Sequence, residues 1–189
     1  MRVWVIALSL GLLSACGEPP QKEMHQAQGA IDAARAAGAD HFAAQELQAA
    51  VDALARAEQA VAARDYRLAL GQALDSREQA DAATRLATDR TAAARAAADA
   101  ALTAASAIVQ RAAERLAAAD IVKLPRRRTA PIRSTLTRAE TSLQEARAAI
   151  ADERYEEAAG AAARATADAE AALAETETAL TPPRRSRRR

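Results

Sequence analysis

The sequence predicts an all-α protein built from elongated antiparallel helical hairpins with coiled-coil-like, Ala-rich packing. Alanine supplies 59 of the 189 residues, and it is the best helix former and a poor strand former. Aromatic residues make up only 2% of the chain, so little apolar area is available for a thick, enzyme-like core. Glycine and proline number six each, so we expect few turns and long helices.

The N-terminal residues are interpreted as a targeting segment. Arg2 precedes an apolar run over residues 3–13, which is too short to span a bilayer and has the length of a signal-peptide core. Residues 13–16, Leu-Ser-Ala-Cys, resemble the bacterial lipobox. The resemblance implies a lipoprotein signal peptide over 1–15 and a diacylglyceryl and palmitate-type anchor on Cys16. Pro19 and Pro20 then predict a short extended tether over 16–22. An ordinary signal peptide is the alternative.

Cys16 is the only cysteine, so a mature chain acylated there has no disulfide. Acyl chains on one residue anchor a protein firmly without a membrane-spanning helix. Gly17, and not Asp, follows the cysteine. In Gram-negative lipoproteins this favours the outer membrane, with the chain facing the periplasm; the inner membrane and the cell surface are the alternatives.

Breaker residues divide the first part of the chain, residues 23–124, into a helical repeat and a long helix. We expect a helix over 23–37, ended by Gly38, and a second over 42–63 with Asp40 as candidate N-cap. Neither Gly nor Pro occurs between Gly71 and Leu124. This stretch predicts a long helix, which from Tyr66 onward reaches roughly 80 Å at 1.5 Å per residue.

Two prolines and three arginines predict a basic loop over residues 125–130. A second helical hairpin is expected over 131–181, because Pro131 suits a first helical turn. Pro182 and Pro183 end that helix. The tail over 182–189 is then expected to be disordered and rich in arginine.

An internal repeat appears at an offset of about 89 residues. Residues 53–83 align without gaps onto residues 142–172. The first copy carries Leu47, Leu54, Val61, Tyr66 and Gly71, which fall on Leu136, Leu143, Ile150, Tyr155 and Gly160. These matches predict a duplication; chance similarity between two amphipathic Ala-rich helices is the alternative.

The heptad stripe loses its phase at the same place in both copies. This predicts a tight helix–helix turn at Arg64 and Asp65, and another at Glu153 and Arg154. A new apolar stripe then starts on another face at Tyr66, Leu70 and Leu74. We expect Tyr66 and Tyr155 to be structural residues that close these turns. One unbroken helix with a drifting stripe is the alternative.

The stretch over residues 38–47, Gly-Ala-Asp-His-Phe-Ala-Ala-Gln-Glu-Leu, is followed by Ala50, Leu54, Ala57, Asp65, Tyr66 and Ala69. This pattern resembles the Ala-rich helical domain of unknown function found in Gram-negative envelope lipoproteins. The resemblance covers about residues 25–95 and, more weakly, 131–180. In that family the domain occurs alone or ahead of an OmpA-like peptidoglycan-binding domain. The resemblance implies an envelope location and supplies no activity.

No residue pattern indicates a catalytic, cofactor or metal site. His25 and His41 are sixteen residues apart and lack converging ligands, so we interpret both as surface residues. The acidic residues alternate with arginine at helical spacing, which is typical of a solvated face. Phosphate-binding and nucleophile motifs do not occur. The sequence therefore predicts a protein that is not an enzyme and uses no cofactor.

Arginines gather at two places, which are the candidate sites for binding polyanions. The first site comprises Arg126, Arg127 and Arg128, and the tail carries Arg184, Arg185, Arg187, Arg188 and Arg189. An exported chain does not meet nucleic acid, and no aromatic residues interleave for base stacking. Anionic lipid, peptidoglycan carboxylates or an acidic envelope protein are the candidate partners. A merely solubilising tail is the alternative.

Two functional classes remain open. The first is a membrane-anchored structural or interaction module that acts as a scaffold or spacer in the envelope. The second is a lipid or small-ligand carrier with a groove between hairpins. One Phe and two Tyr offer few large side chains to line such a groove, which favours the scaffold.

Overall fold

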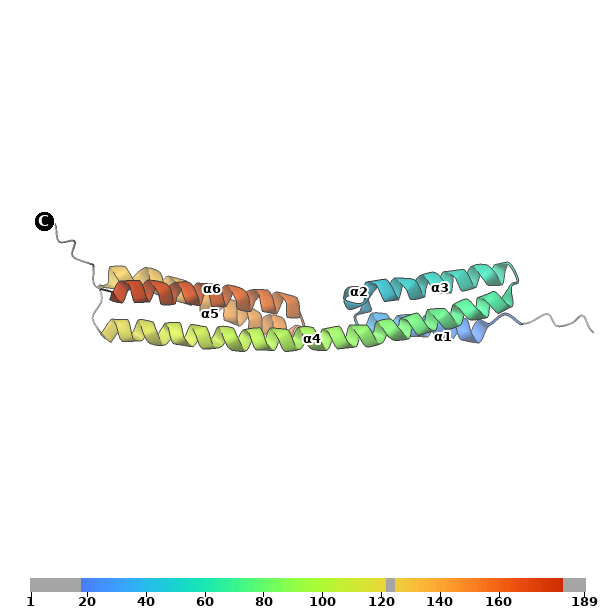
Figure 1. Ribbon diagram of the computed structural model, residues 1–189, viewed down its shortest axis with the longest axis horizontal. Helices are drawn as coiled ribbons and strands as arrows, with labels where there is room; N and C mark the ends of the chain where they lie inside the picture. Colours follow the sequence, from blue (N-terminus) through green and yellow to red (C-terminus); the bar gives the residue numbers. More distant parts are fainter. Residues whose placement is uncertain (1–17, 122–124, 182–189) are drawn as a thin grey trace, which may run out of the picture. The chain divides into compact units, whose positions relative to one another are not determined.

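The computed structural model describes residues 18–121 and 125–181, which form α-helices and short connections (Figure 1). The helices are α1 (Gln21–Ala36), α2 (Ala39–Phe42), α3 (Ala44–Ala62), α4 (Tyr66–Ile121), α5 (Arg126–Ala151) and α6 (Tyr155–Leu180). No strand occurs in these two ranges, and the all-α prediction is confirmed. The predicted signal peptide, Cys16 and the arginine tail lie outside the described residues.

The chain divides into two compact units, Met1–Thr91 and Ala92–Arg189, so the boundary falls inside α4. A division between residues 124 and 131, as the sequence predicts, is wrong. The reason is that Val109 and Leu116, in the second half of α4, pack into one core with α5 and α6. Burial of these two side chains assigns this part of α4 to the second unit.

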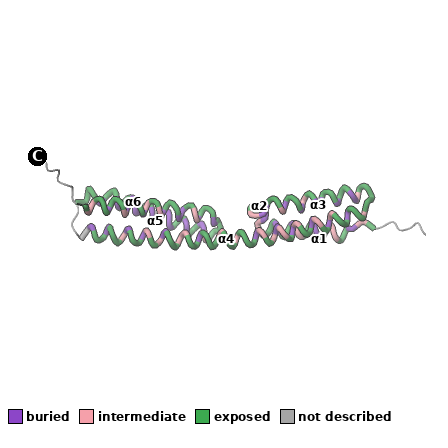
Figure 2. Tube along the Cα trace, viewed as in Figure 1, coloured by how far each residue is buried: buried purple, intermediate pink, exposed green. Residues whose placement is uncertain are grey.

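The first unit packs α1, α3 and the beginning of α4 around one core. Its buried residues are Ala27, Ile31 and Ala34 of α1, Leu47, Ala50 and Leu54 of α3, and Ala80, Ala83 and Ala87 of α4, with Ala39 and Ala43 between α1 and α3. Figure 2 shows the buried positions on the sides of the helices that face their partners. The predicted α3–α4 hairpin is present, and α1 completes it as a three-helix bundle.

The second unit repeats this arrangement. Its core contains Ala105, Val109, Ala112 and Leu116 of α4, Ile132, Leu136, Ala139, Leu143 and Ala146 of α5, and Ala161, Ala162, Ala165, Ala169 and Ala172 of α6. The helix that completes each bundle is α1 in the first unit and the second half of α4 in the second. These two also follow the 89-residue offset, because Pro20 and Ala27 are buried at the positions equivalent to Val109 and Leu116. Small alanine side chains let the helices of each unit approach closely.

Both predicted tight turns are present, and they share one geometry. Arg64 and Glu153 adopt left-handed backbone conformations, with φ of 59° and 61°. The Asp65 amide donates to the Ala60 carbonyl at 2.9 Å, and the equivalent Arg154 amide donates to the Ala149 carbonyl at 2.8 Å. This is the Schellman pattern, which satisfies carbonyls that a helix end leaves free. The same turn therefore occurs in both copies without a glycine.

The connection between α1 and α3 follows the prediction only in part. Gly38, with φ of 83°, follows the end of α1 as expected. Asp40, however, lies inside α2 and does not cap the next helix. Ala43 precedes α3 and provides no side-chain cap. The methyl group of Ala43 is buried, so α3 begins with packing in place of the side-chain cap that was expected from Asp40.

The predicted basic loop over 125–130 is wrong, because α5 begins at Arg126 and includes Pro131. Thr129 and Ile132 lie three residues apart on one helical face, and both are buried. Burial of this face extends the helix by more than a turn. Pro131 cannot donate a backbone hydrogen bond, but it is exposed, so water can reach the carbonyl that it leaves free.

Within the described residues, α4 includes a window long and apolar enough to cross a membrane, judged by length and composition alone. The window falls within Tyr66–Ala119, has a mean hydropathy of 1.3, and is 17% buried. Its hydropathy comes largely from alanine. Because α4 supplies core residues to both units, we describe it as a bundle helix.

Candidate functional site

The strongest positive feature that the structure describes is the beginning of α5. Arg126, Arg127 and Arg128 are exposed, and the first turn of the helix has no acidic residue. A helix N-terminus carries partial positive charge and unsatisfied amides, so the backbone adds to the field of the three side chains. Neither Arg126 nor Arg127 forms an ion pair with another described residue. This end of α5 is therefore suited to an anion.

Arg128 is partly engaged with the neighbouring helix. Its Nη1 donates to the Ala179 carbonyl near the end of α6 at 3.5 Å. A shallow depression beside it is lined by Arg128, Ile132, Ala174, Glu175, Thr178 and Ala179. The depression combines an apolar floor with one guanidinium and one carboxylate, so it lacks the depth and the net charge of a specific anion pocket.

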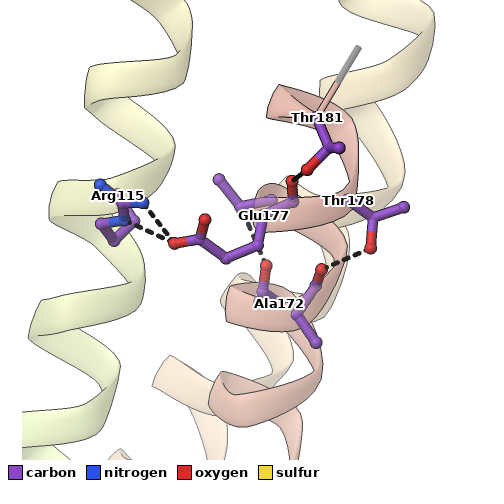
Figure 3. Close-up of polar contacts among 7 residues, drawn as sticks. Arg115, Ala172, Glu177, Thr178 and Thr181 are labelled. Carbon is purple, nitrogen blue, oxygen red and sulfur yellow. Dashed lines mark hydrogen bonds and ion pairs between the residues drawn. The ribbon is translucent and has the colours of Figure 1, made fainter. Parts of the chain in front are cut away.

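An ion pair between α4 and α6 lies in the last turns of both helices (Figure 3). Arg115 Nε donates to Glu177 Oε1 at 2.9 Å, and Nη2 of the same side chain also contacts that oxygen. Thr178 and Thr181 direct their hydroxyls to backbone carbonyls of α6, at 2.9 Å each. Arg115 is thus neutralised, and the three arginines that begin α5 carry the free positive charge at this place.

The two tyrosines begin equivalent helices and differ in burial. Tyr155 starts α6 and is only 8% exposed, because it packs against Ala94 and Ala98 of α4. Tyr66 starts α4 and is half-buried. Asp65 caps α4 by accepting a hydrogen bond from the Leu68 amide at 3.0 Å, whereas no side chain caps α6.

Three leucines near the beginning of α4 are exposed, Leu68 at 51%, Leu70 at 38% and Leu74 at 49%. The equivalent positions in the second unit hold Glu157, Ala159 and Ala163. The apolar stripe at Leu70 and Leu74 was predicted from the sequence, but its exposure among the described residues was not. Exposed leucines among alanines are the second candidate surface of this protein.

The histidines do not meet. His25 is exposed on α1, and His41 is exposed on α2, where its ring contacts the edge of Phe42 at 4.5 Å between centroids. Among the described residues, no group of three or more His, Cys, Asp or Glu converges.

The pKa of Arg154 is raised above its ordinary value, mainly because its side chain donates to Asp152 and also faces Glu157.

Comparison of the chain with family models, with curated proteins and with solved structures gave no match.

Proposed function

We propose that this chain is a lipid-anchored protein of the bacterial envelope that acts as a structural or interaction module and performs no catalysis. The observation that carries the proposal is the lipobox-like sequence at residues 13–16, directly after an apolar run over 3–13. A cysteine at that point becomes the anchored N-terminus of the mature chain. The resemblance to the Ala-rich domain of Gram-negative lipoproteins points to the same location, with the outer membrane as the expected site.

The packing of the two units supports a scaffolding role. Each unit buries mainly alanine methyl groups, so its helices approach closely and leave little space for a ligand. The charged side chains that the structure describes lie outside the cores and form pairs between neighbouring helices, such as Arg138 with Asp168 and Arg164 with Glu145. A duplicated bundle of this kind offers long outer faces on which other envelope components can bind.

Arginines supply the proposed contact with these components. Arg126, Arg127 and Arg128 begin α5, and five further arginines lie in the tail over 184–189. Guanidinium groups bind phosphates and carboxylates through paired hydrogen bonds. Lipid headgroups, peptidoglycan carboxylates and acidic protein surfaces of the envelope are the partners that this chemistry fits.

Mass spectrometry of the mature N-terminal peptide tests the anchor, and we expect the lipid on Cys16. The Cys16→Ser variant should leave the membrane fraction, while Ser14→Ala, which keeps a small residue in the box, should remain there. Membrane association by an unmodified Cys16 would overturn the proposal.

Crosslinking in intact cells, followed by identification of the captured component, tests the scaffold. Capture of an envelope protein or of peptidoglycan is the expected result. Co-purification of lipid with the soluble mature chain would instead support the carrier function.

A further inference from the structure

The exposed leucines lie where α1 stops short of the end of the first unit. Arg77 Nη1 of α4 donates to Gln26 Oε1 of α1 at 3.3 Å, which marks the face of α4 that α1 covers. Leu70 and Leu74 precede Arg77 by seven and three residues, a spacing that places all three on one helical face. The residue seven positions before Gln26 is Pro19, and α1 begins only at Gln21. Among the described residues, no helix therefore lies opposite Leu70, and Leu74, opposite Glu23 in the first turn of α1, is still 49% exposed.

The second unit shows what this face meets when the third helix continues. There Tyr155, the equivalent of Tyr66, packs against Ala94 and Ala98 of α4. The positions equivalent to Leu70 and Leu74 are Ala159, which is half-buried, and Ala163, which is exposed. The first unit thus carries larger apolar side chains than the second at these two positions, and both of them are exposed.

We propose that Leu70 and Leu74, with Tyr66 beside them, contact the lipid bilayer that holds Cys16. The inference rests on the proposed function, because it takes Cys16 as the point of attachment. Cys16 precedes Gln21 by five residues, which span at most about 18 Å. In the first unit, the beginning of α1 and the turn between α3 and α4 lie at the same end (Figure 1). The anchored chain therefore brings this face of α4 within reach of the bilayer.

The charges around the leucines make the contact apolar and not electrostatic. Lys22, Arg64 and Arg67 lie at this end of the unit, with Glu18 and Asp65 among them. These charges nearly balance, so we expect this end of the unit to bind an anionic membrane surface only slightly more tightly than a neutral one. Once the chain is attached, even a small apolar area binds, because attachment raises the effective concentration of the membrane.

Leu68 provides a matched control. It is as exposed as Leu74, but it lies two residues before Leu70, about 200° around the helix. A bilayer that covers Leu70 and Leu74 does not cover Leu68. The side chain of Ala163, at the position equivalent to Leu74, provides a second control in the other unit.

Single tryptophans report the contact, since Trp4 is the only tryptophan and it lies in the proposed signal peptide. The mature chain is attached through the Cys16 thiol to a maleimide lipid in phosphatidylethanolamine and phosphatidylglycerol vesicles. We expect the emission of Leu74→Trp to shift to shorter wavelength and to be quenched by brominated lipid. Quenching should be several-fold weaker in Leu68→Trp and Ala163→Trp.

Equal quenching at all three positions would overturn the inference. A shift to shorter wavelength without lipid quenching would also overturn it, since it would show that protein, such as a second copy, covers the stripe. In the attached chain, adding Leu70→Gln to Leu74→Trp should weaken quenching by brominated lipid several-fold, because it removes the neighbouring apolar side chain from the contact; unchanged quenching would count against the bilayer. Acylation of Cys16 in cells is measured separately, so its failure is distinguishable from a failure here.

Discussion

Glycine at either left-handed position should stabilise the protein. Arg64 and Glu153 hold φ of 59° and 61°, a conformation in which the Cβ of an L-residue costs about 1–2 kcal/mol. Glycine removes this cost. Because glycine is also freer in the unfolded chain, the substitution lowers the free energy of unfolding by about 0.4–1 kcal/mol at the same time. Neither side chain forms an ion pair among the described residues. We therefore predict a net gain of about 0.5–1 kcal/mol for Arg64→Gly and for Glu153→Gly.

Thermal unfolding of the mature chain, followed by far-ultraviolet circular dichroism, measures this gain. For a unit of this size, about 0.5–1 kcal/mol corresponds to a rise in Tm of about 2–8 °C. Each substitution should raise the transition of its own unit, because the two turns belong to different units. The double variant should add the two effects, since they share no contacts.

Ala63→Gly is the matched control. Ala63 precedes Arg64 with φ of −79°, an ordinary conformation for alanine, so glycine there should lower stability by about 0.5–1 kcal/mol. If Arg64→Gly lowers Tm as much as Ala63→Gly does, the left-handed conformation is not the source of strain and the reasoning is refuted.

Three further predictions concern the cores and the tail. Leu143→Ala, at a side chain only 5% exposed, should cost about 2–5 kcal/mol; a loss below about 1 kcal/mol in urea unfolding would contradict the described core. Ser76 Oγ donates to the Ala50 carbonyl at 2.8 Å, yet the equivalent residue is Ala165, so Ser76→Ala should cost at most about 1.5 kcal/mol, and unfolding of the unit would refute this. Deletion of residues 184–189 should weaken sedimentation with anionic vesicles at low salt and have no effect at high salt; an unchanged result at low salt would leave the tail a solubilising end.

Local features of the fold were accessible from the sequence. The turns at Arg64 and Glu153 lack glycine and proline, yet the break of the Leu47–Leu54 heptad stripe located them, and its recurrence in the second copy strengthened the prediction. Gly38 marked the end of α1 because few other residues tolerate φ near 83°. Periodicity and breakers depend on neighbours along the chain, and so they appear in the sequence.

Features that depend on partners distant in sequence were not accessible. A stripe of Ala98, Ala105 and Ala112 has the same spacing whether it faces one helix or two, so the packing of α1 and of the second half of α4 as third helices of their units was not predicted. Proline and arginine at residues 125–131 indicate a loop by local preference, but burial of Thr129 and Ile132 forms a helix there. At the candidate sites, the exposure of Leu70 and Leu74 depends on how α1 and α3 pack against α4, which the local sequence does not reveal.

The alanine cores have a calorimetric consequence. Alanine loses almost no side-chain entropy on burial, and each methyl group removes little apolar surface from water. The heat capacity change of unfolding scales with that surface. The free energy of unfolding should therefore vary less with temperature here than in a leucine-rich bundle of equal length. A modest maximum stability is then combined with a broad temperature range over which the helices stay folded.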